Sequence, residues 1–197
     1  EAELVKLFSN AYRYINFSIS NQFYMICQNQ NLNFFKIRNI MREGYLRNAN
    51  IPESGFTAGP CLLKDTMQLS SFYNHRFKLG HAAMSVNEGI PEFIIKNLQK
   101  KYNLKKKIIG VLGLTFKAET DDIRDSLAIK LVKLLKSKKI NTFQSDEFYE
   151  NKENIPKNEL IKKADIIILA TPHKAYKKLK IQKNKIIVDI WGLIENK

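Results

Sequence analysis

Four short segments with the character of strands in the second half of the sequence constrain the fold most strongly. They lie within KKIIGVLGL (106–114), INTFQ (140–144), DIIILAT (165–171) and KIIVDIW (185–191). All but INTFQ contain a continuous apolar run, which is typical of strands that are buried on both faces of a sheet. The segments 126–138 and 157–164 between them have helical periodicity, and this alternation predicts a doubly wound parallel sheet.

The first half of the sequence has helical periodicity instead. Between residues 1 and 28, apolar residues recur every three or four positions, and Val5, Tyr14 and Phe17 widen the stripe. A long helix that is apolar on more than one side is expected to lie between partners. Further helices are expected at about 34–43, from Pro60 to about residue 73, and at about 79–102.

The change in pattern near residue 103 divides the chain into two expected domains. Residues 1–102 are expected to form a helical domain, and residues 103–197 an α/β domain. A chain of 197 residues has room for two such domains with a buried core. The predicted fold class is therefore α + α/β, a helical region followed by a Rossmann-like, doubly wound parallel sheet.

The composition favours a soluble protein with a strong positive charge. Hydrophobic residues make up 44% and charged residues 26%, and no apolar run reaches the roughly 18 residues that span a bilayer. The N-terminal segment EAELVKLFSN is acidic and amphipathic, unlike a secretory signal, so a cytoplasmic location without membrane attachment is expected. The formal charge of +14 fits a solvated lysine-rich surface, an anionic small ligand or nucleic acid, although no nucleic-acid motif accompanies it.

The two cysteines lie in different surroundings, and neither has the spacing of a zinc or redox pair. Cys27 belongs to an apolar helical pattern and is expected to be a small core residue. Cys61 follows the turn-rich segment GFTAGP and precedes a helix, which favours an exposed thiol with thiolate character. Asp65 lies four residues later, so a nucleophilic thiol and a carboxylate that handles water could act together. The alternative is an inert cysteine at the start of a helix.

Two further segments offer polar candidates. Lys6 and Asn10 lie four residues apart on the first helix and could present donors to an oxyanion, unless they are simply solvated. Residues 115–126 follow the first expected strand and contain Lys117 and a helix N-cap at Asp125 or Ser126. The segment GVLG (110–113) lacks the G-x-G-x-x-G spacing of dinucleotide-binding loops, so any nicotinamide cofactor is expected to bind elsewhere.

Three motifs, in this order, resemble the UDP-glucose/GDP-mannose dehydrogenase family over essentially the whole chain. EAELVKLFSNAYRYINFSISN resembles the central helix of that family, GFTAGPCLLKDT its catalytic cysteine loop, and GVLGLTFKAETDDIRDS the start of its nucleotide-sugar domain. The resemblance implies that the C6 alcohol of a UDP-sugar is oxidised to the acid by NAD in two hydride transfers. It also implies a thiohemiacetal and then a thioester on Cys61, from which water releases a uronate for polysaccharide biosynthesis.

The resemblance assigns roles to individual residues. The implied catalytic residues are Cys61, Lys6, Asn10 and Asp65. The implied substrate-binding residues are Arg47, Gly55, Phe56, Gly59, Leu62, Lys64, Phe116 and Lys117. Arg47, in GYLRNANIP, matches an arginine that reaches into the neighbouring subunit's substrate site. A homodimer built around the long first helix is therefore expected.

Departures from the family pattern leave the substrate and the activity open. The N-terminal NAD-binding domain of the family is not among these 197 residues, so the chain alone is expected to be inactive. Trp191 stands where UDP-glucose enzymes often have an arginine, so N-acetylated UDP-hexosamines are an alternative to UDP-glucose, the first expectation. Pro60 differs from the histidine of some branches, and His173 is expected to be a structural cap rather than a nucleotide contact. A non-catalytic nucleotide-sugar-binding or assembly module is the alternative from another class, and a nucleic-acid-binding protein is a third.

Overall fold

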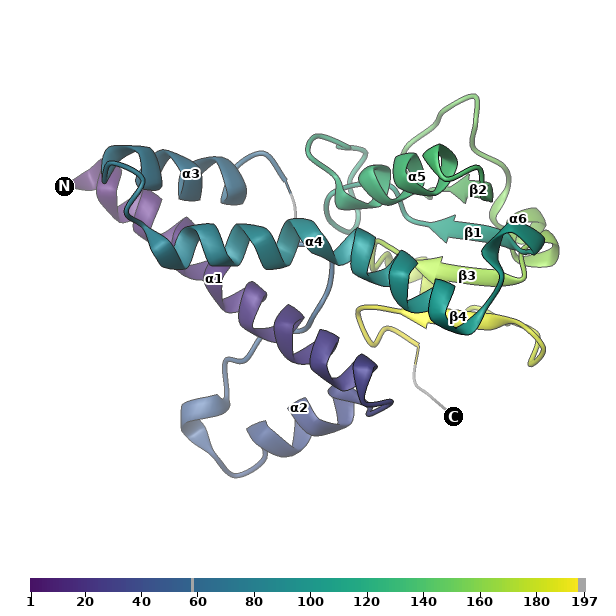
Figure 1. Ribbon diagram of the computed structural model, residues 1–197, viewed down its shortest axis with the longest axis horizontal. Helices are drawn as coiled ribbons and strands as arrows, with labels where there is room; N and C mark the ends of the chain where they lie inside the picture. Colours follow the sequence, from purple (N-terminus) through teal and green to yellow (C-terminus); the bar gives the residue numbers. More distant parts are fainter. Residues whose placement is uncertain (58, 195–197) are drawn as a thin grey trace. The chain divides into compact units, whose positions relative to one another are not determined.

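The computed structural model describes residues 1–57 and 59–194, and the chain forms two compact units (Figure 1). The first unit is Glu1–Ile90 and the second is Pro91–Lys197. The boundary between them lies inside helix α4 (Lys78–Lys101), which continues through Pro91. The expected division after residue 102 falls just beyond the end of this helix, and as a division into functional domains it stays a prediction.

The first unit is helical, as the sequence predicts. Its elements are α1 (Ala2–Asn29), α2 (Phe34–Arg42), η1 (Leu46–Asn48), α3 (Leu62–Phe72) and the first part of α4. Helices α1 and α3 pack against each other. The side chain of Asn33 accepts a hydrogen bond from the Lys36 N–H and thereby caps the start of α2.

Helix α1 has two apolar faces. One face is buried in the first unit and carries residues such as Leu7, Ala11 and Tyr14. The other face is exposed and carries Val5, Phe8, Tyr12, Ile19, Phe23 and Ile26, whose exposed fractions run from 38% to 69%. We call these six residues the exposed α1 stripe. Their spacing of three, four or seven residues keeps them on one side of the helix.

The second unit contains a parallel four-stranded sheet. Its strands are β1 (Ile108–Leu112), β2 (Asn141–Ser145), β3 (Ile166–Leu169) and β4 (Ile186–Asp189), in the order β2-β1-β3-β4. The connections contain helices α5 (Leu127–Ser137) and α6 (Lys157–Lys163), and the short helices η2 (Leu104–Lys106) and η3 (Lys174–Tyr176) complete the unit. Strands β1 and β3 are almost completely buried, which explains their continuous apolar runs. The predicted α + α/β fold class is confirmed.

The strand order creates a switch point between β1 and β3. The chain leaves β1 through α5 to reach β2 on one side, and returns through α6 to β3 on the other side of β1. Because parallel crossovers are right-handed, α5 and α6 cover opposite faces of the sheet. Ligands of such sheets bind beyond the carboxyl ends of the strands, next to a switch point of this kind.

Ser126 is the N-cap of helix α5, and the sequence left open whether Asp125 or Ser126 would take this position. The Ser126 hydroxyl accepts hydrogen bonds from the N–H groups of Ala128 and Ile129 and donates one to the carbonyl of Leu114. Asp125 instead has a φ of 52° and lies before the cap. Within the described residues, no helix combines the length and the apolarity required to span a membrane.

Candidate functional site

A buried carboxylate in the first unit brings three of the predicted site residues together. The Asn10 Nδ2 group donates a hydrogen bond to the Asp65 Oδ2 atom over 2.6 Å. The Lys6 ammonium lies 3.3 Å from the same oxygen atom. Lys6 and Asn10 come from α1 and Asp65 from the first turn of α3, so the packing of these two helices creates the contact.

The Asp65 side chain has no solvent exposure, whereas the Lys6 side chain is 62% exposed. The second carboxylate oxygen, Oδ1, is also buried, and it has no hydrogen-bond partner among the described residues. A buried carboxylate oxygen without a donor is unfavourable, because burial removes the water that would otherwise solvate it. Asp65 therefore keeps an acceptor position that suits a water molecule or a ligand hydroxyl group.

Cys61 occupies the N-cap position of α3 and is exposed. Its side chain makes no capping hydrogen bond to the helix. The Asp65 N–H donates to the Cys61 carbonyl over 2.8 Å, so the carboxylate residue lies one helical turn after the cysteine. The thiol therefore lies at the N-terminus of α3, next to the backbone N–H groups of its first turn. The other cysteine, Cys27, is buried, and burial raises the pKa of its thiol.

The turn before Cys61 depends on glycine at two positions. Gly55 has a φ of 151° and Gly59 a φ of 110°, which side chains with a Cβ rarely adopt. Phe56 is only 3% exposed and packs inside the turn, and its neighbours Gly55 and Thr57 are buried as well. The Thr57 hydroxyl is buried and, among the described residues, has no hydrogen-bond partner. Ala58 lies outside the described residues.

The remaining candidates in the first unit have different exposures. Arg47 is exposed at the end of η1, and Lys64 is exposed on α3. Leu62 is partly buried at the start of α3. Of the predicted site residues in this unit, the structure brings Lys6, Asn10 and Asp65 into direct contact, with Cys61 one turn away.

The second unit carries the two other predicted residues in the connection after β1. Lys117 is exposed and Phe116 is partly buried. The Lys117 ammonium lies 5.4 Å from the centre of the Phe116 ring, at a distance typical of a cation–π contact. Both residues lie beyond the carboxyl end of β1, next to the switch point of the sheet.

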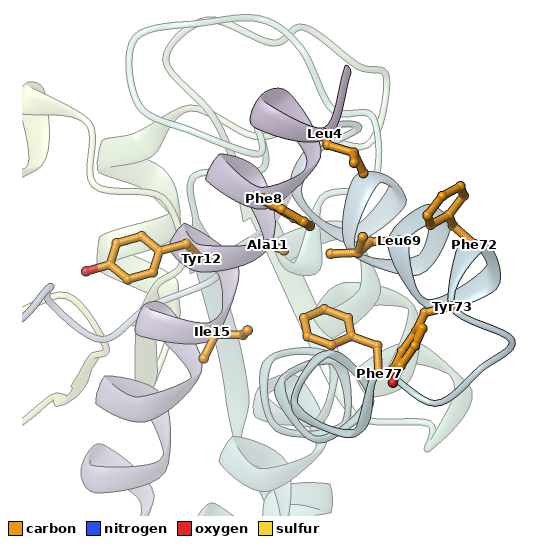
Figure 2. A pocket seen from close by; sticks show the side chains of 9 residues that line it. All are labelled: Leu4, Phe8, Ala11, Tyr12, Ile15, Leu69, Phe72, Tyr73 and Phe77. Carbon is orange, nitrogen blue, oxygen red and sulfur yellow. The ribbon is translucent and has the colours of Figure 1, made fainter. Parts of the chain in front are cut away.

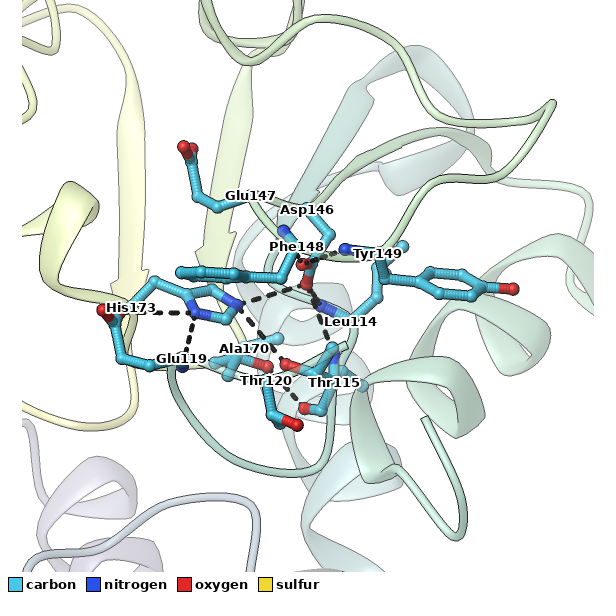
Figure 3. A network of polar contacts seen from close by, with 12 residues as sticks. Leu114, Thr115, Glu119, Thr120, Asp146, Glu147, Phe148, Tyr149, Ala170 and His173 are labelled. Carbon is cyan, nitrogen blue, oxygen red and sulfur yellow. Dashed lines mark hydrogen bonds and ion pairs between the residues drawn. The ribbon is translucent and has the colours of Figure 1, made fainter. Parts of the chain in front are cut away.

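Asp146, which the sequence analysis missed, organises the loops at this edge of the sheet (Figure 3). Its side chain is completely buried. Its carboxylate oxygens accept hydrogen bonds from the backbone N–H groups of Leu114, Thr115, Phe148 and Tyr149. Burial alone would raise the pKa of Asp146, but hydrogen bonds from His173 and from backbone N–H groups outweigh this effect and hold the pKa below its ordinary value. Its position directly after an expected buried strand was the available sequence signal.

His173 is the side-chain partner of Asp146. Its Nδ1 atom accepts the Glu119 N–H over 3.1 Å, so the proton of the neutral ring is assigned to Nε2, which lies 3.3 Å from the Asp146 Oδ2 atom. The His173 side chain is completely buried, and its ring packs against the rings of Phe148 and Tyr176. His173 occupies the N-cap position of η3, but its side chain makes no capping hydrogen bond to that helix. Its side chain instead joins the loops after β1, β2 and β3, so the expected capping role of the side chain is corrected to this one.

Two family models match this chain, and together they cover most of it. The model described as the central domain of the UDP-glucose/GDP-mannose dehydrogenase family matches residues 1–89. The model described as the UDP binding domain of the same family matches residues 110–196. The chain belongs to the UDP-glucose/GDP-mannose dehydrogenase family.

Several proteins that resemble this chain carry related names. The chain is 30% identical to UDP-N-acetyl-D-mannosamine dehydrogenase of Pyrococcus horikoshii, over 98% of this chain and 49% of the relative. It is 26% identical to NDP-N-acetyl-D-galactosaminuronic acid dehydrogenase of Ralstonia solanacearum, over 98% of this chain and 48% of the relative. A solved structure of UDP-D-ManNAc dehydrogenase from Pyrococcus horikoshii matches with a TM-score of 0.84 and 27% identity, over 98% of this chain and 48% of that chain. The chain thus spans about half the length of the curated relatives that it matches.

Dehydrogenases of this family generally use NAD, but the glycines of the second unit do not form a cradle for it. A Cβ atom on Gly110 would overlap with the Leu160 side chain and approach the Ala164 Cβ to 2.9 Å. A Cβ atom on Gly113 would approach the Thr171 backbone nitrogen to 2.7 Å. Both glycines are thus required for packing within the unit, so we assign no NAD contact to these residues. Within the described residues, no group of three or more His, Cys, Asp or Glu side chains is arranged to hold a metal ion.

Trp191 follows the end of β4 and is partly buried. Its indole Nε1–H donates to the Ala170 carbonyl over 3.0 Å, which anchors the ring near the end of β3. The Trp191 N–H donates to the Asp189 carboxylate. The single indole donor already has a partner in the protein, so this side chain offers packing surface rather than charge to a ligand.

The first unit also contains an open apolar hollow of about 420 Å³ (Figure 2). It is lined by Leu4, Phe8, Ala11, Tyr12 and Ile15 of α1, by Leu69 and Phe72 of α3, and by Tyr73 and Phe77. Phe8 and Tyr12 belong to the exposed α1 stripe as well, so the hollow and the stripe form one continuous apolar surface.

Proposed function

We propose that this chain carries the substrate-binding and thiol-bearing part of a UDP-sugar 6-dehydrogenase. Membership of the family supports the reaction class. The observation that carries the assignment to particular residues is the buried Asp65 carboxylate, which contacts Lys6 and Asn10 one turn after an exposed cysteine at a helix N-terminus. Bound NAD would supply the two oxidations by accepting two hydride ions, and we assign no NAD contact to the described residues.

The proposed role of Cys61 is nucleophilic. Its thiolate adds to the C6 aldehyde, a carbon–sulfur bond forms, and the carbonyl electron pair moves to oxygen. The ammonium group of Lys6 and the amide of Asn10, which contact Asp65 one helical turn after Cys61, are the donors proposed to stabilise this developing charge. After the second oxidation the sugar is held as a thioester. Water then adds to the acyl carbon, the carbon–sulfur bond breaks, and the thiolate leaves as the uronate is released.

The proposed role of Asp65 is to accept a proton from that water. Its Oδ2 atom is occupied by Asn10 and Lys6, whereas the buried Oδ1 atom has no partner among the described residues. A water molecule held by Oδ1 would lose its proton to the carboxylate as it attacks the acyl carbon. Replacement of Asp65 by Asn would keep the shape of the side chain and remove this proton acceptor.

The proposed substrate contacts come from both units, each taken by itself. In the first unit they are Arg47, Gly55, Phe56, Gly59, Leu62 and Lys64. In the second unit they are Phe116 and Lys117, at the edge of the sheet where parallel α/β folds bind nucleotides. Lys117 is a cation suited to a phosphate or a sugar hydroxyl group.

We propose an N-acetylated UDP-hexosamine as the substrate, ahead of UDP-glucose. The named relatives act on N-acetylated sugars according to their names, and Trp191 replaces the arginine that is frequent in UDP-glucose enzymes. UDP-glucose was the first expectation from the sequence, and it remains the competing substrate in the test.

Alkylation of Cys61 by iodoacetamide, read by mass spectrometry, tests the proposal on the 197-residue chain. We expect UDP-N-acetylmannosamine to slow the modification of Cys61, since a bound sugar covers the exposed thiol. ADP-glucose serves as the control nucleotide sugar, and the buried Cys27 serves as the internal control for unfolding. If neither N-acetylated UDP-hexosamines nor UDP-glucose protect Cys61, the chain is not the substrate part of such an enzyme. A second test combines the chain with a separate NAD-binding part and measures turnover. If the sugars bind but Cys61→Ser leaves this turnover unchanged, the chain is a non-catalytic binding module.

We further propose that the chain forms a homodimer through α1. The exposed α1 stripe continues into the apolar hollow on the same helix, which gives one extended apolar surface. Monomeric proteins rarely expose large contiguous apolar patches, and a second copy of the same helix presents a matching surface.

Substitution within the stripe tests the homodimer. We expect Phe8→Glu combined with Ile19→Glu to convert a dimer into a monomer, since two charges would be buried without partners. Sedimentation velocity measures the change, with Arg13→Glu, an exposed position on α1 outside the stripe, as the matched control. A wild-type chain that sediments as a monomer at high micromolar concentration would contradict the proposal.

A further inference from the structure

A buried chain of three hydrogen bonds runs from α4 through α1 to the turn before Cys61. The Asn87 Nδ2 group donates to the Tyr14 carbonyl over 3.1 Å. The Asn21 Nδ2 group donates to the Asn87 Oδ1 atom over 2.8 Å, and the Asn21 Oδ1 atom accepts the Gly55 N–H over 2.8 Å. Both asparagine residues are completely buried. We call this pair the Asn21–Asn87 relay.

The relay has only one possible orientation. A backbone carbonyl can only accept, so Asn87 must direct its NH2 group at Tyr14 and its oxygen at Asn21. A backbone N–H can only donate, so Asn21 must direct its oxygen at Gly55 and its NH2 group at Asn87. Because both ends are backbone groups, neither amide can rotate by 180° without leaving two donors or two acceptors face to face in a buried site.

The relay binds the turn at Gly55, a residue whose backbone conformation favours glycine. Gly55 has a left-handed φ, and the turn leads through Gly59 to the exposed Cys61. A second bond to α1 lies next to the relay, since the Ser20 hydroxyl donates to the Pro52 carbonyl over 2.9 Å. The Arg38 guanidinium of α2 also donates to the carbonyls of Ile51 and Pro52. The start of the turn is thus bound from two helices, whereas Gly55 itself is bound by Asn21.

We propose, on the basis of the function proposed above, that Asn21 and Asn87 are positioning residues for the substrate-binding turn. Asn21 fixes the position of the backbone at Gly55 and Phe56, and thereby the position of the turn that a nucleotide sugar contacts. Asn87 acts through Asn21, because it removes the alternative orientation of that amide. Neither side chain touches the substrate.

The hydrogen-exchange rate of the Gly55 amide, measured by NMR, reports directly on its hydrogen bond to Asn21. Removing the partner of a buried N–H makes local opening of the turn easier, so we expect Asn21→Ala to speed this exchange by about tenfold to a hundredfold. Asn87→Ala leaves the Asn21 oxygen in place, so a smaller increase is expected. Asn29→Ala, at an exposed position on the same helix, is the matched control and should leave the rate unchanged.

The conservative variant Asn21→Asp separates positioning from stability. Its carboxylate can still accept the Gly55 N–H, but it cannot donate to Asn87. We therefore expect the Gly55 amide to stay protected while the free energy of unfolding falls. A residue that merely fills the core would give no such difference between Asn21→Asp and Asn21→Ala.

Calorimetric titration with UDP-N-acetylmannosamine and with UDP-glucose then tests the functional part. At a temperature where circular dichroism shows each variant folded, we expect Asn21→Ala to raise the Kd by about tenfold and Asn21→Asp to restore most of the affinity. Two outcomes for Asn21→Ala would overturn the positioning role and leave the proposed function intact. One is exchange of the Gly55 amide at the wild-type rate, and the other is faster exchange with an unchanged Kd. A wild-type chain that binds neither sugar would overturn the proposed function, and the positioning role with it.

Discussion

At the scale of single residues, Asp146 shows how one buried carboxylate can order three loops. Its acceptors bind N–H groups from the connection after β1 and from the segment after β2, and His173 joins it from the segment after β3. The ionised form is the one that these donors favour, which is why the pKa lies below its ordinary value despite burial. The loops that carry Phe116 and Lys117 therefore depend on the charge of a residue outside the proposed site.

This dependence predicts a loss of stability in acid. The folded-state pKa of Asp146 lies below the unfolded-state value, so its contribution is fully present above the ordinary aspartate range. The contribution is lost as the pH falls through that range and then through the folded-state pKa. Asp146→Asn should lower the free energy of unfolding at pH 7 by about 1–3 kcal/mol and flatten its acid dependence. Urea unfolding over a pH series measures both effects, and Asp121→Asn, an exposed carboxylate in the connection after β1, should behave as the wild type does.

At the scale of elements, the contact between β1 and α6 depends on the absence of a side chain. Gly110 lies in the middle of β1, and Leu160 and Ala164 at α6 occupy the space that a Cβ atom would need. Gly89 in α4 is the opposite case, because a Cβ atom there would meet nothing within 4 Å. The sequence shows a single glycine at both positions, but only Gly110 lacks room for a side chain.

The two alanine substitutions should therefore change stability in opposite directions. Gly110→Ala is expected to lower the free energy of unfolding by about 1–3 kcal/mol, since the strand and helix must move apart. Gly89→Ala is expected to raise it by about 0.5–1 kcal/mol, since alanine is the better helix former. Urea denaturation monitored by circular dichroism compares both variants with the wild type. Equal effects of the two substitutions would contradict the packing assigned to Gly110.

At the scale of the whole molecule, the main physical property is charge. The chain has a formal charge of +14, and its 33 basic residues outnumber its 19 acidic ones. An excess of this size produces a positive potential that attracts anionic ligands before contact. A nucleotide sugar carries negative charge on its diphosphate, so the field favours the proposed substrate class.

Binding of UDP-sugars should consequently weaken with salt. We expect the Kd of UDP-N-acetylmannosamine to rise by roughly tenfold between low and high sodium chloride concentrations, since salt screens the charges of the protein and the diphosphate. Calorimetric titration with uridine, which has the same base and no phosphate, provides the control. Equal salt dependence for the two ligands would show that the positive charge of the chain makes no contribution to binding.

Much of the fold could be predicted from the sequence because local patterns specify it. The apolar runs at 106–114 and 165–171 predicted strands, and β1 and β3 lie inside them. The helical periodicity of residues 1–28 predicted α1 to within one residue at either end. Strand ends were less accurate, since a run of apolar or basic residues continues beyond the last hydrogen bond of the ladder.

The candidate site could be predicted only in part. Cys61, Lys6, Asn10 and Asp65 were found by spacing and by resemblance, and their catalytic roles stay predictions. The contacts of Asn10 and Lys6 with Asp65 could not be derived from spacing, because they join residues that are 55 and 59 positions apart. Asp146 was missed because the donors that tie it to other loops, Leu114 and His173, come from segments far away in the sequence.

The sequence by itself determined the elements of this protein: which segments are helices, which are strands, and that the strands run parallel. Helix and strand identity follow from the periodicity of neighbouring residues, which each segment carries alone, and the parallel direction follows from the alternation of strands with helices along the chain. Only the tertiary structure decided which buried polar groups meet, as in the Asn21–Asn87 relay and the contact between Asp146 and His173. The physical reason is that a hydrogen bond requires two groups within about 3 Å, and that distance depends on how whole helices and strands pack.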